Sequence, residues 1–180
     1  MNPDRIDLLG RTFAPLISEA DILERLAAFA AELNAQGGGE PPLLVPVLSG
    51  AFWVFAELAR QLTIPYAIDF VKLSSYGSGT MGGSLTLQLP LSQPIEGRRV
   101  VVIEDIVDTG RTSDFLHAYL LDRGAARVEL YSLLFKPDRF AGQHPPTAYG
   151  FSIPPAFVVG FGLDYAEAGR WLRGIYALVE

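Results

Sequence analysis

The stretch VVIEDIVDTGRT, residues 101–112, joins an apolar run to three carboxylates and a small turn rich in hydroxyl groups. The run is nearly all β-branched, which is typical of a central parallel strand covered on both faces, and we expect this strand over residues 98–105. Glu104, Asp105 and Asp108 then fall at its carboxyl end. In open parallel sheets this is the edge where ligands bind, so the charge indicates a site.

The segments around this stretch alternate between strand and helix patterns. A strand, a helix and a second strand in that order form a βαβ unit, which is right-handed in nearly all cases. A helix with Ser18 as N-cap is expected to end at the glycines 37–39 and to bury one face. The tail 149–172 is expected to hold a Pro-Pro break, a strand and a final short helix. The other expected strands are 42–50, 66–73, 85–91 and 126–136, the other helices are 51–62 and 113–124, and the buried face of the first helix is Ile22, Leu26, Phe29, Ala30 and Leu33.

Composition narrows the class of protein. A chain of 180 residues with 49% hydrophobic residues is expected to form one domain with its own core. Because there is no cysteine and only two histidines, any metal should be a hard cation on oxygen ligands, usually Mg²⁺. The net charge of −6 argues against nucleic acid as a partner. No apolar run approaches the ~20 residues that span a bilayer, so a cytoplasmic protein with no membrane partner is expected.

The turn after the strand has the groups that bind a phosphate. It offers a flexible glycine at Gly110, two hydroxyls, a cation and a run of backbone amides. Beside carboxylates, such a turn favours a ligand with both a phosphate and hydroxyl groups or a metal, as in a sugar phosphate. In the alternative interpretation, Glu104 and Asp105 end the strand at the surface and Asp108 is the N-cap of the next helix.

The motif resembles the phosphoribosyl diphosphate signature of the type I phosphoribosyltransferases, and residues 43–172, approximately, are similar to their hypoxanthine-guanine branch. The resemblance implies an α/β fold in which helices flank a central, mainly parallel sheet and a small hood lobe is added. We expect one domain, 1–180, with a hood from the N-terminal residues and about 137–180. The implied reaction transfers the 5-phosphoribosyl group to N9 of hypoxanthine or guanine and releases diphosphate.

The resemblance also implies roles for individual residues. Asp108 would be the general base that takes the proton from purine N7, and Lys136 would donate to the 6-oxo oxygen. Phe157 would stack on the base, and the Val158 carbonyl would face its C2 edge. The residues implied to bind phosphoribosyl diphosphate are Ser49, Gly50, Ser75, Tyr76, Glu104, Asp105, Asp108, Thr109, Gly110, Arg111, Thr112 and Arg170. Asp164 joins Lys136, Phe157 and Val158 in the purine group, and the implied Mg²⁺ ligands are Glu104, Asp105 and Asp164.

Some features depart from the family or fall outside its motifs. The family usually has Lys where this chain has Ser49, next to its non-proline cis peptide bond, and Asn where it has Ala166. The glycines of 77–82 match G-x-G-x-x-G, but a strand pattern follows them and not a helix, which excludes a dinucleotide site. The family has a mobile lid here. His117 is expected inside a helix and His144 in a loop, and neither is given a role.

Two alternatives to this function remain open from the sequence. The first is a regulator with the same fold that binds the ligand without catalysis, and its expected mark, a basic face or an added DNA-binding module, is not found in this acidic chain. The second is a relative that prefers guanine or xanthine, since small shifts of carbonyl groups would decide the base. The resemblance implies a homodimer or homotetramer.

Overall fold

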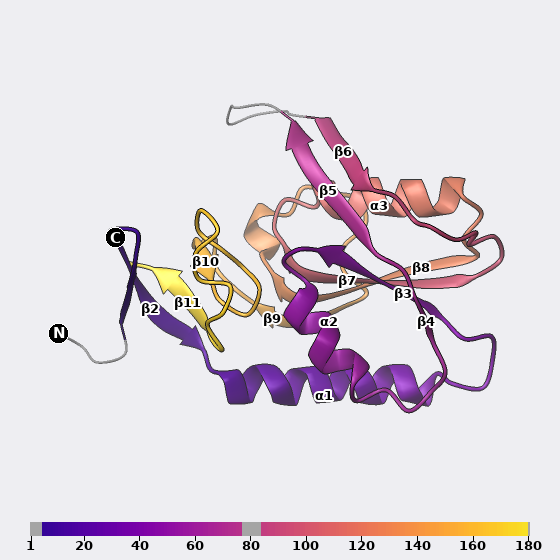
Figure 1. Cartoon of the computed structure of the whole chain (residues 1–180), viewed down its shortest axis with the longest axis horizontal. Helices are drawn as coiled ribbons and strands as arrows, with labels where there is room; N and C mark the ends of the chain where they lie inside the picture. Colours follow the sequence, from indigo (N-terminus) through magenta and orange to yellow (C-terminus); the bar gives the residue numbers. More distant parts are fainter. Residues whose placement is uncertain (1–4, 77–83, 180) are drawn as a thin grey trace.

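In the computed structural model, residues 5–76 and 84–179 are described. Strands and helices alternate through the middle of the chain, and short strands lie at both ends (Figure 1). The elements are β1 (Ile6–Leu8), β2 (Arg11–Ile17), α1 (Glu19–Ala35), β3 (Leu43–Leu48), α2 (Phe52–Ala59), β4 (Ala67–Ile68), β5 (Val71–Tyr76), β6 (Ser84–Leu89), β7 (Arg99–Val107), α3 (Arg111–Asp122), β8 (Arg127–Phe135), the 3₁₀ turn η1 (Pro137–Arg139), β9 (Ala148–Ser152), β10 (Val158–Val159) and β11 (Ile175–Leu178).

The central sheet has the order β6-β5-β3-β7-β8-β9, and β4 pairs beside β3. All of its pairings are parallel except that of β5 with β6. β7 lies in the middle, where its alternate residues enter two different cores. Val101 and Ile103 pack with α1 and α2, whereas Val100 and Val102 pack with α3. This two-sided burial confirms the predicted central strand and the expected α/β fold class.

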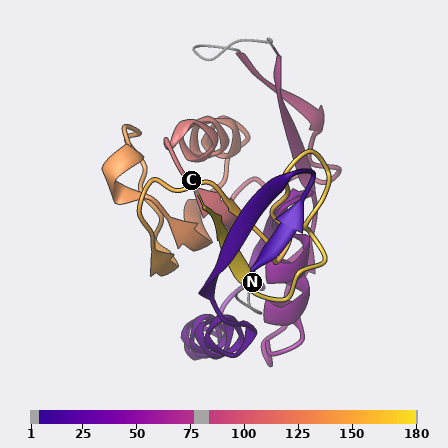
Figure 2. The same ribbon diagram turned by 90° about the vertical axis from the view of Figure 1, so that its left-hand side faces the viewer.

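A second, antiparallel sheet joins the two ends of the chain in the order β1-β2-β11-β10. Figure 2 looks onto it, with the indigo helix α1 below and the salmon helix α3 above. β9 pairs with β8 and so belongs to the central sheet, although it follows residue 137. The C-terminal strands of the small sheet begin at Val158.

Helix α1 follows its sequence pattern closely. The Ser18 hydroxyl accepts the Asp21 N–H at 3.2 Å, as expected of an N-cap. Its buried residues are the predicted face: Ile22, Leu26, Phe29, Ala30 and Leu33. No helix within 5–76 and 84–179 is long and apolar enough to cross a membrane.

The C-terminal segment corrects one prediction. The expected final short helix is wrong, because residues 160–172 form turns held by two isolated bridges, Gly160 to Leu163 and Tyr165 to Ala168. Ala166 and Glu167 have φ values of 48° and 69°, and an α-helix does not contain such left-handed residues. The predicted strand 66–73 is also divided into β4 and β5. The glycine-rich segment 77–83, where the lid was expected, lies outside the described residues.

Candidate active site

The site is built at the carboxyl end of β7 and in the turn that leads to α3. This strand continues to Val107, two residues further than predicted, so Glu104 and Asp105 lie inside it and Asp108 directly follows it. A cavity of about 290 Å³ opens here. It is lined by Val47 and by every residue from Glu104 to Ser113, including Thr109, Gly110, Arg111 and Thr112.

Glu104 is a buried acid. Its side chain is only 3% exposed, and its Oε1 has no hydrogen-bond partner within the described part of the chain. Burial raises the pKa of Glu104 well above its ordinary value of 4.5, and the charge of Asp105 raises it further. The surface-end interpretation of this acidic pair is therefore wrong.

Asp105 is fixed between two parts of the chain. Its Oδ1 accepts the Ile106 N–H at 2.9 Å, and its carboxylate lies so close to Gly50 that a methyl group there would overlap it. Burial raises the pKa of Asp105 to about 6, against the hydrogen bonds and the charge of Arg170, which lower it. Too little positive charge therefore surrounds the two adjacent acids. A bound cation or the hydroxyl groups of a ligand would stabilise their charged forms.

Asp108 is held by two cations. Lys136 Nζ lies 2.9 Å from Oδ2, and Arg139 Nε lies 2.6 Å from Oδ1 in an ion pair. Lys136 is itself buried, at 5% exposure, so this lysine is not the solvated end of a strand. The N-cap of α3 is Gly110, with no side-chain cap, so the N-cap interpretation of Asp108 is wrong as well.

Arg139 was not predicted from the sequence. It lies on η1, three residues after Lys136, and the 3₁₀ turn brings both cations to one carboxylate. Proline followed by aspartate is common in turns, so the dipeptide Pro137-Asp138 predicts a turn directly after Lys136. Such a turn is the one sequence signal that would place Arg139 near Lys136.

The turn between β7 and α3 leaves backbone amides at a helix N-terminus. Gly110 has φ +87°, a left-handed conformation that favours glycine, and α3 begins at Arg111. The first N–H groups of a helix have no partner inside the helix, and they carry partial positive charge. This is the arrangement that binds phosphate in other α/β proteins.

A second cluster faces Asp105 from the loop after β3. The Leu48–Ser49 peptide bond is cis, as the family resemblance implied. Gly162, with φ +102°, lies against the Gly50 carbonyl so closely that a side chain would overlap it. Arg170 donates from Nη1 to the Gly162 carbonyl at 2.7 Å.

The same arginine forms an ion pair with Asp164, Nη2 to Oδ1 at 2.6 Å. The charges of Asp164 and Arg170 both act on the pKa of Asp105. The structure therefore brings Gly50 and Asp105 together with Asp164 and Arg170, which lie about sixty residues or more further along the chain.

The remaining predicted residues lie on other elements. Phe157 is 47% exposed and packs edge-on against Tyr165, with ring centroids 5.8 Å apart. Val158 is on β10, the edge of the small sheet. Because the Leu178 N–H bonds to the Phe157 carbonyl, the Val158 carbonyl points away from β11, as a contact to a base edge requires. Ser75 and Tyr76 end β5, where it pairs with β6.

The acidic residues fit a magnesium ion only in part. Among residues 5–76 and 84–179, no three side chains of His, Cys, Asp or Glu gather to hold a metal ion. Magnesium commonly takes one or two carboxylates and completes its shell with water and substrate phosphates. The unpartnered Glu104 oxygen and the raised pKa of Asp105 provide such a pair.

Comparisons with known proteins agree with this geometry. The profile of the phosphoribosyl transferase domain matches residues 18–166. The hypoxanthine-guanine phosphoribosyltransferase of Bacillus subtilis is 37% identical over 164 residues, 91% of each chain. A bifunctional protein TilS/HprT of Listeria innocua is 40% identical over 159 residues, which are 86% of this chain but only 24% of that protein.

The fold comparison gives the same result. A crystal structure of a hypoxanthine-guanine phosphoribosyltransferase from Bacillus anthracis matches with a TM-score of 0.86 and 34% identity, covering 92% of this chain and 98% of that one. The chain therefore belongs to the phosphoribosyltransferase family, in its branch of hypoxanthine-guanine enzymes of purine salvage.

Proposed function

We propose that the protein transfers the 5-phosphoribosyl group of phosphoribosyl diphosphate to N9 of hypoxanthine or guanine. The observation that carries this proposal is the buried Glu104 and the half-buried Asp105 next to a helix N-terminus, with Asp108 held by Lys136 and Arg139. In the reaction, the bond from N9 to ribose C1 forms and the bond from C1 to the diphosphate oxygen breaks. The electron pair leaves on diphosphate, and the N7 proton goes to Asp108.

The acids act on the charge that this reaction develops. As the bond to diphosphate breaks, positive charge builds on the ribose ring, and nearby carboxylates stabilise it. Glu104 and Asp105 are assigned to the ribose hydroxyls, and the loop 108–112 is assigned to the 5′-phosphate. Because burial has removed water from Glu104, its interaction with a ligand is stronger than it would be at a surface.

Lys136 serves both Asp108 and the base. An ammonium group has three N–H donors, so it can keep its 2.9 Å contact with Asp108 and direct another hydrogen to the 6-oxo oxygen. Adenine carries an amino group at that position, which is also a donor. The amino group would therefore meet the lysine as donor against donor and leave one N–H of Lys136 without an acceptor, which accounts for the expected selection for 6-oxopurines.

The other two assignments concern the leaving group and the base edge. The Ser49-Gly50 amides and Arg170 are assigned to diphosphate. Phe157 is assigned to stacking on the purine and the Val158 carbonyl to its C2 edge. Asp164, 2.6 Å from Arg170, is placed to position this arginine as well as to meet a cation.

Magnesium, when bound, would neutralise charge on the diphosphate and so make it a better leaving group. Glu104 and Asp105 are the residues that would hold it on the ribose side, and Asp164 on the diphosphate side. A homodimer or homotetramer, a cytoplasmic location, a closing lid that contains Ser75 and Tyr76, and the hood boundary at about 137 remain predictions.

The role of Asp108 is tested with Asp108→Asn and a control, Asp138→Asn, on the exposed surface of η1 nearby. A general base contributes about 10²–10⁴-fold to a rate. We expect kcat of Asp108→Asn to fall by that range while the Kd for phosphoribosyl diphosphate, measured calorimetrically, changes less than about threefold. The control should match the wild type. Unchanged turnover in Asp108→Asn would contradict the assignment.

A further inference from the structure

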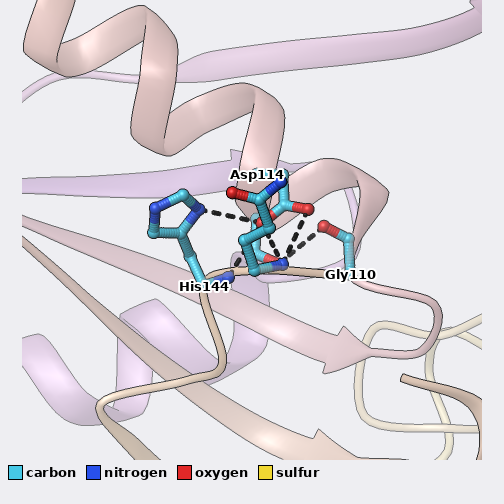
Figure 3. A network of polar contacts seen from close by, with 5 residues as sticks. Gly110, Asp114 and His144 are labelled. Atoms are coloured by element: carbon cyan, nitrogen blue, oxygen red, sulfur yellow. Dashed lines mark hydrogen bonds and ion pairs between the residues drawn. The ribbon is translucent and has the colours of Figure 1, made fainter. Parts of the chain in front are cut away.

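Asp114, in the first turn of α3, connects the phosphate-binding turn to a distant segment. Its carboxylate accepts the Gln143 N–H at 2.9 and 3.0 Å and the His144 N–H at 2.9 Å (Figure 3). The oxygen that accepts the His144 N–H is Oδ1 of Asp114, and His144 Nδ1 also lies 2.9 Å from it. One carboxylate therefore holds two consecutive amides and an imidazole that follow it by about thirty residues in the chain.

The segment that Asp114 holds lies directly behind the turn. The Ala141 N–H donates to the Thr109 carbonyl at 3.1 Å. A methyl group on Gly110 would approach the Phe140 ring to 2.5 Å and Gly142 Cα to 2.9 Å. The segment 140–144 thus packs against the peptide of Gly110 without a gap.

Asp114 is also bonded to the turn itself. Its backbone N–H donates to the Gly110 carbonyl at 2.9 Å, and the Ser113 hydroxyl donates to the same oxygen at 2.8 Å. The main chain of Asp114 therefore holds Gly110, while its side chain holds the segment that supports Gly110 from behind.

We infer that Asp114 is a positioning residue for the 5′-phosphate: its carboxylate fixes segment 140–144 behind Gly110 and thereby sets the directions of the amides in the turn 108–112. The inference rests on the proposed assignment of this turn to phosphate. Backbone amides bind an anion well only when they converge within about 0.5 Å of the productive geometry. The carboxylate accepts hydrogen bonds from Gln143 and His144, in the segment behind the turn, so we assign it a role through the turn and not on the substrate.

The inference is testable because a pure charge effect of Asp114 and a positioning effect predict opposite changes in phosphate binding. A negative charge in the first turn of a helix opposes the binding of an anion there. Removing it by Asp114→Asn should therefore strengthen phosphate binding if charge alone mattered. If the carboxylate acts by holding the two amides, the same variant should weaken binding. The Asn NH2 group would meet the Gln143 N–H, a donor against a donor, and a neutral amide oxygen accepts the other N–H groups less strongly than a carboxylate does.

The experiment measures KM for each substrate in Asp114→Asn and in a control, Asp122→Asn, which removes the same charge from the far end of α3. We expect KM for phosphoribosyl diphosphate to rise about tenfold in Asp114→Asn, with kcat and the KM for hypoxanthine within about twofold of the wild type. Asp122→Asn should match the wild type. A lower or unchanged KM for phosphoribosyl diphosphate would overturn the inference. A fall in kcat alone, as expected when part of the protein is unfolded, would also overturn it.

A second variant separates position from charge. A methyl group at Gly142 would lie 2.9 Å from Asp114 Oδ2 and 3.1 Å from Gly110 Cα, so Gly142→Ala should move the segment away from the turn without changing any charge. We expect the same rise in KM, with the Tm of both variants recorded to show that they are folded. No rise in Gly142→Ala would contradict the inference. If the wild type turns over no purine, the proposed function fails, and calorimetric Kd values for phosphoribosyl diphosphate in the same variants still decide the role of Asp114.

Discussion

The half-buried carboxylate of Asp105 should destabilise the protein without its ligands, and Asp105→Asn should remove this effect. The pKa of Asp105 is about 6 in the folded protein, compared with an ordinary value of 3.8. Since the folded state holds this proton more tightly than the unfolded chain, stability falls as the pH rises from about 4 to about 6, and the whole loss is present above pH 6. The pKa of Glu104 is also raised, so this residue likewise lowers stability as the pH rises.

The size of the effect follows from the pKa difference. The interval from 3.8 to about 6, at about 1.4 kcal/mol per pKa unit, corresponds to at most about 3 kcal/mol. Because Asp105 is partly exposed, we expect roughly 1.5–3 kcal/mol at pH 8. Asparagine has the same shape and keeps an oxygen for the Ile106 N–H, so the substitution loses no hydrogen bond in the folded state.

Urea denaturation at pH 8 and pH 5, without magnesium or phosphoribosyl diphosphate, measures this gain. Asp105→Asn should be more stable than the wild type at pH 8 and show about half that gain at pH 5, where the folded wild type is already mostly protonated. Its Tm should rise by roughly 4–10 °C at pH 8. Asp138→Asn is the control and should show no gain. Equal or lower stability of Asp105→Asn at pH 8, or a gain that does not change with pH, would refute the reasoning.

Three further substitutions have defined outcomes. Arg139→Ala should lower kcat roughly tenfold, because Asp108 loses one of the two cations that position it. Its Tm should shift by less than about 3 °C, since Arg139 is half exposed. A normal kcat would contradict a positioning role for Arg139. Ser49→Lys, which restores the family's usual cation, should lower KM for phosphoribosyl diphosphate about threefold in steady-state assays, and a raised KM would contradict this. Gly162→Ala should cost roughly 2–4 kcal/mol in urea denaturation, because its φ is +102° and a methyl group would overlap Gly50, whereas near wild-type stability would mean that this contact is dispensable.

The sequence predicted the fold where local pattern and tertiary environment agree. The β-branched run before Glu104 predicts a central strand, because apolar side chains on both of its faces must be buried against other elements. Helix α1 has a clear cap at Ser18 and one apolar face, so its buried residues could be read directly. The final short helix was predicted wrongly because the composition of residues 166–172 favours a helix, whereas the observed turns depend on left-handed residues such as Ala166.

The site was predictable to the extent that it lies in one motif. Glu104, Asp105 and Asp108 stand together in the sequence, and the structure keeps them at one cavity. The contact between Lys136 and Asp108 joins residues 28 apart, and only the pairing of β7 with β8 brings them together.

Other parts of the site have little or no sequence signature. Arg139 and Asp114 are ordinary surface types whose roles depend on where the 3₁₀ turn and the segment 140–144 lie. The close contact of Gly162 with Gly50 likewise exists only in the folded chain.

The most direct test of the central claim is the initial rate with phosphoribosyl diphosphate and Mg²⁺ against hypoxanthine, guanine, xanthine and adenine in turn, with nucleotide formation followed by absorbance. The role proposed for the buried Lys136, as donor to a 6-oxo oxygen, predicts turnover of hypoxanthine and none of adenine. The relative rates with guanine and xanthine would then define the preference within the branch. Turnover of adenine at a comparable rate would contradict the role of Lys136, and binding of phosphoribosyl diphosphate without turnover of any base would contradict the account as a whole.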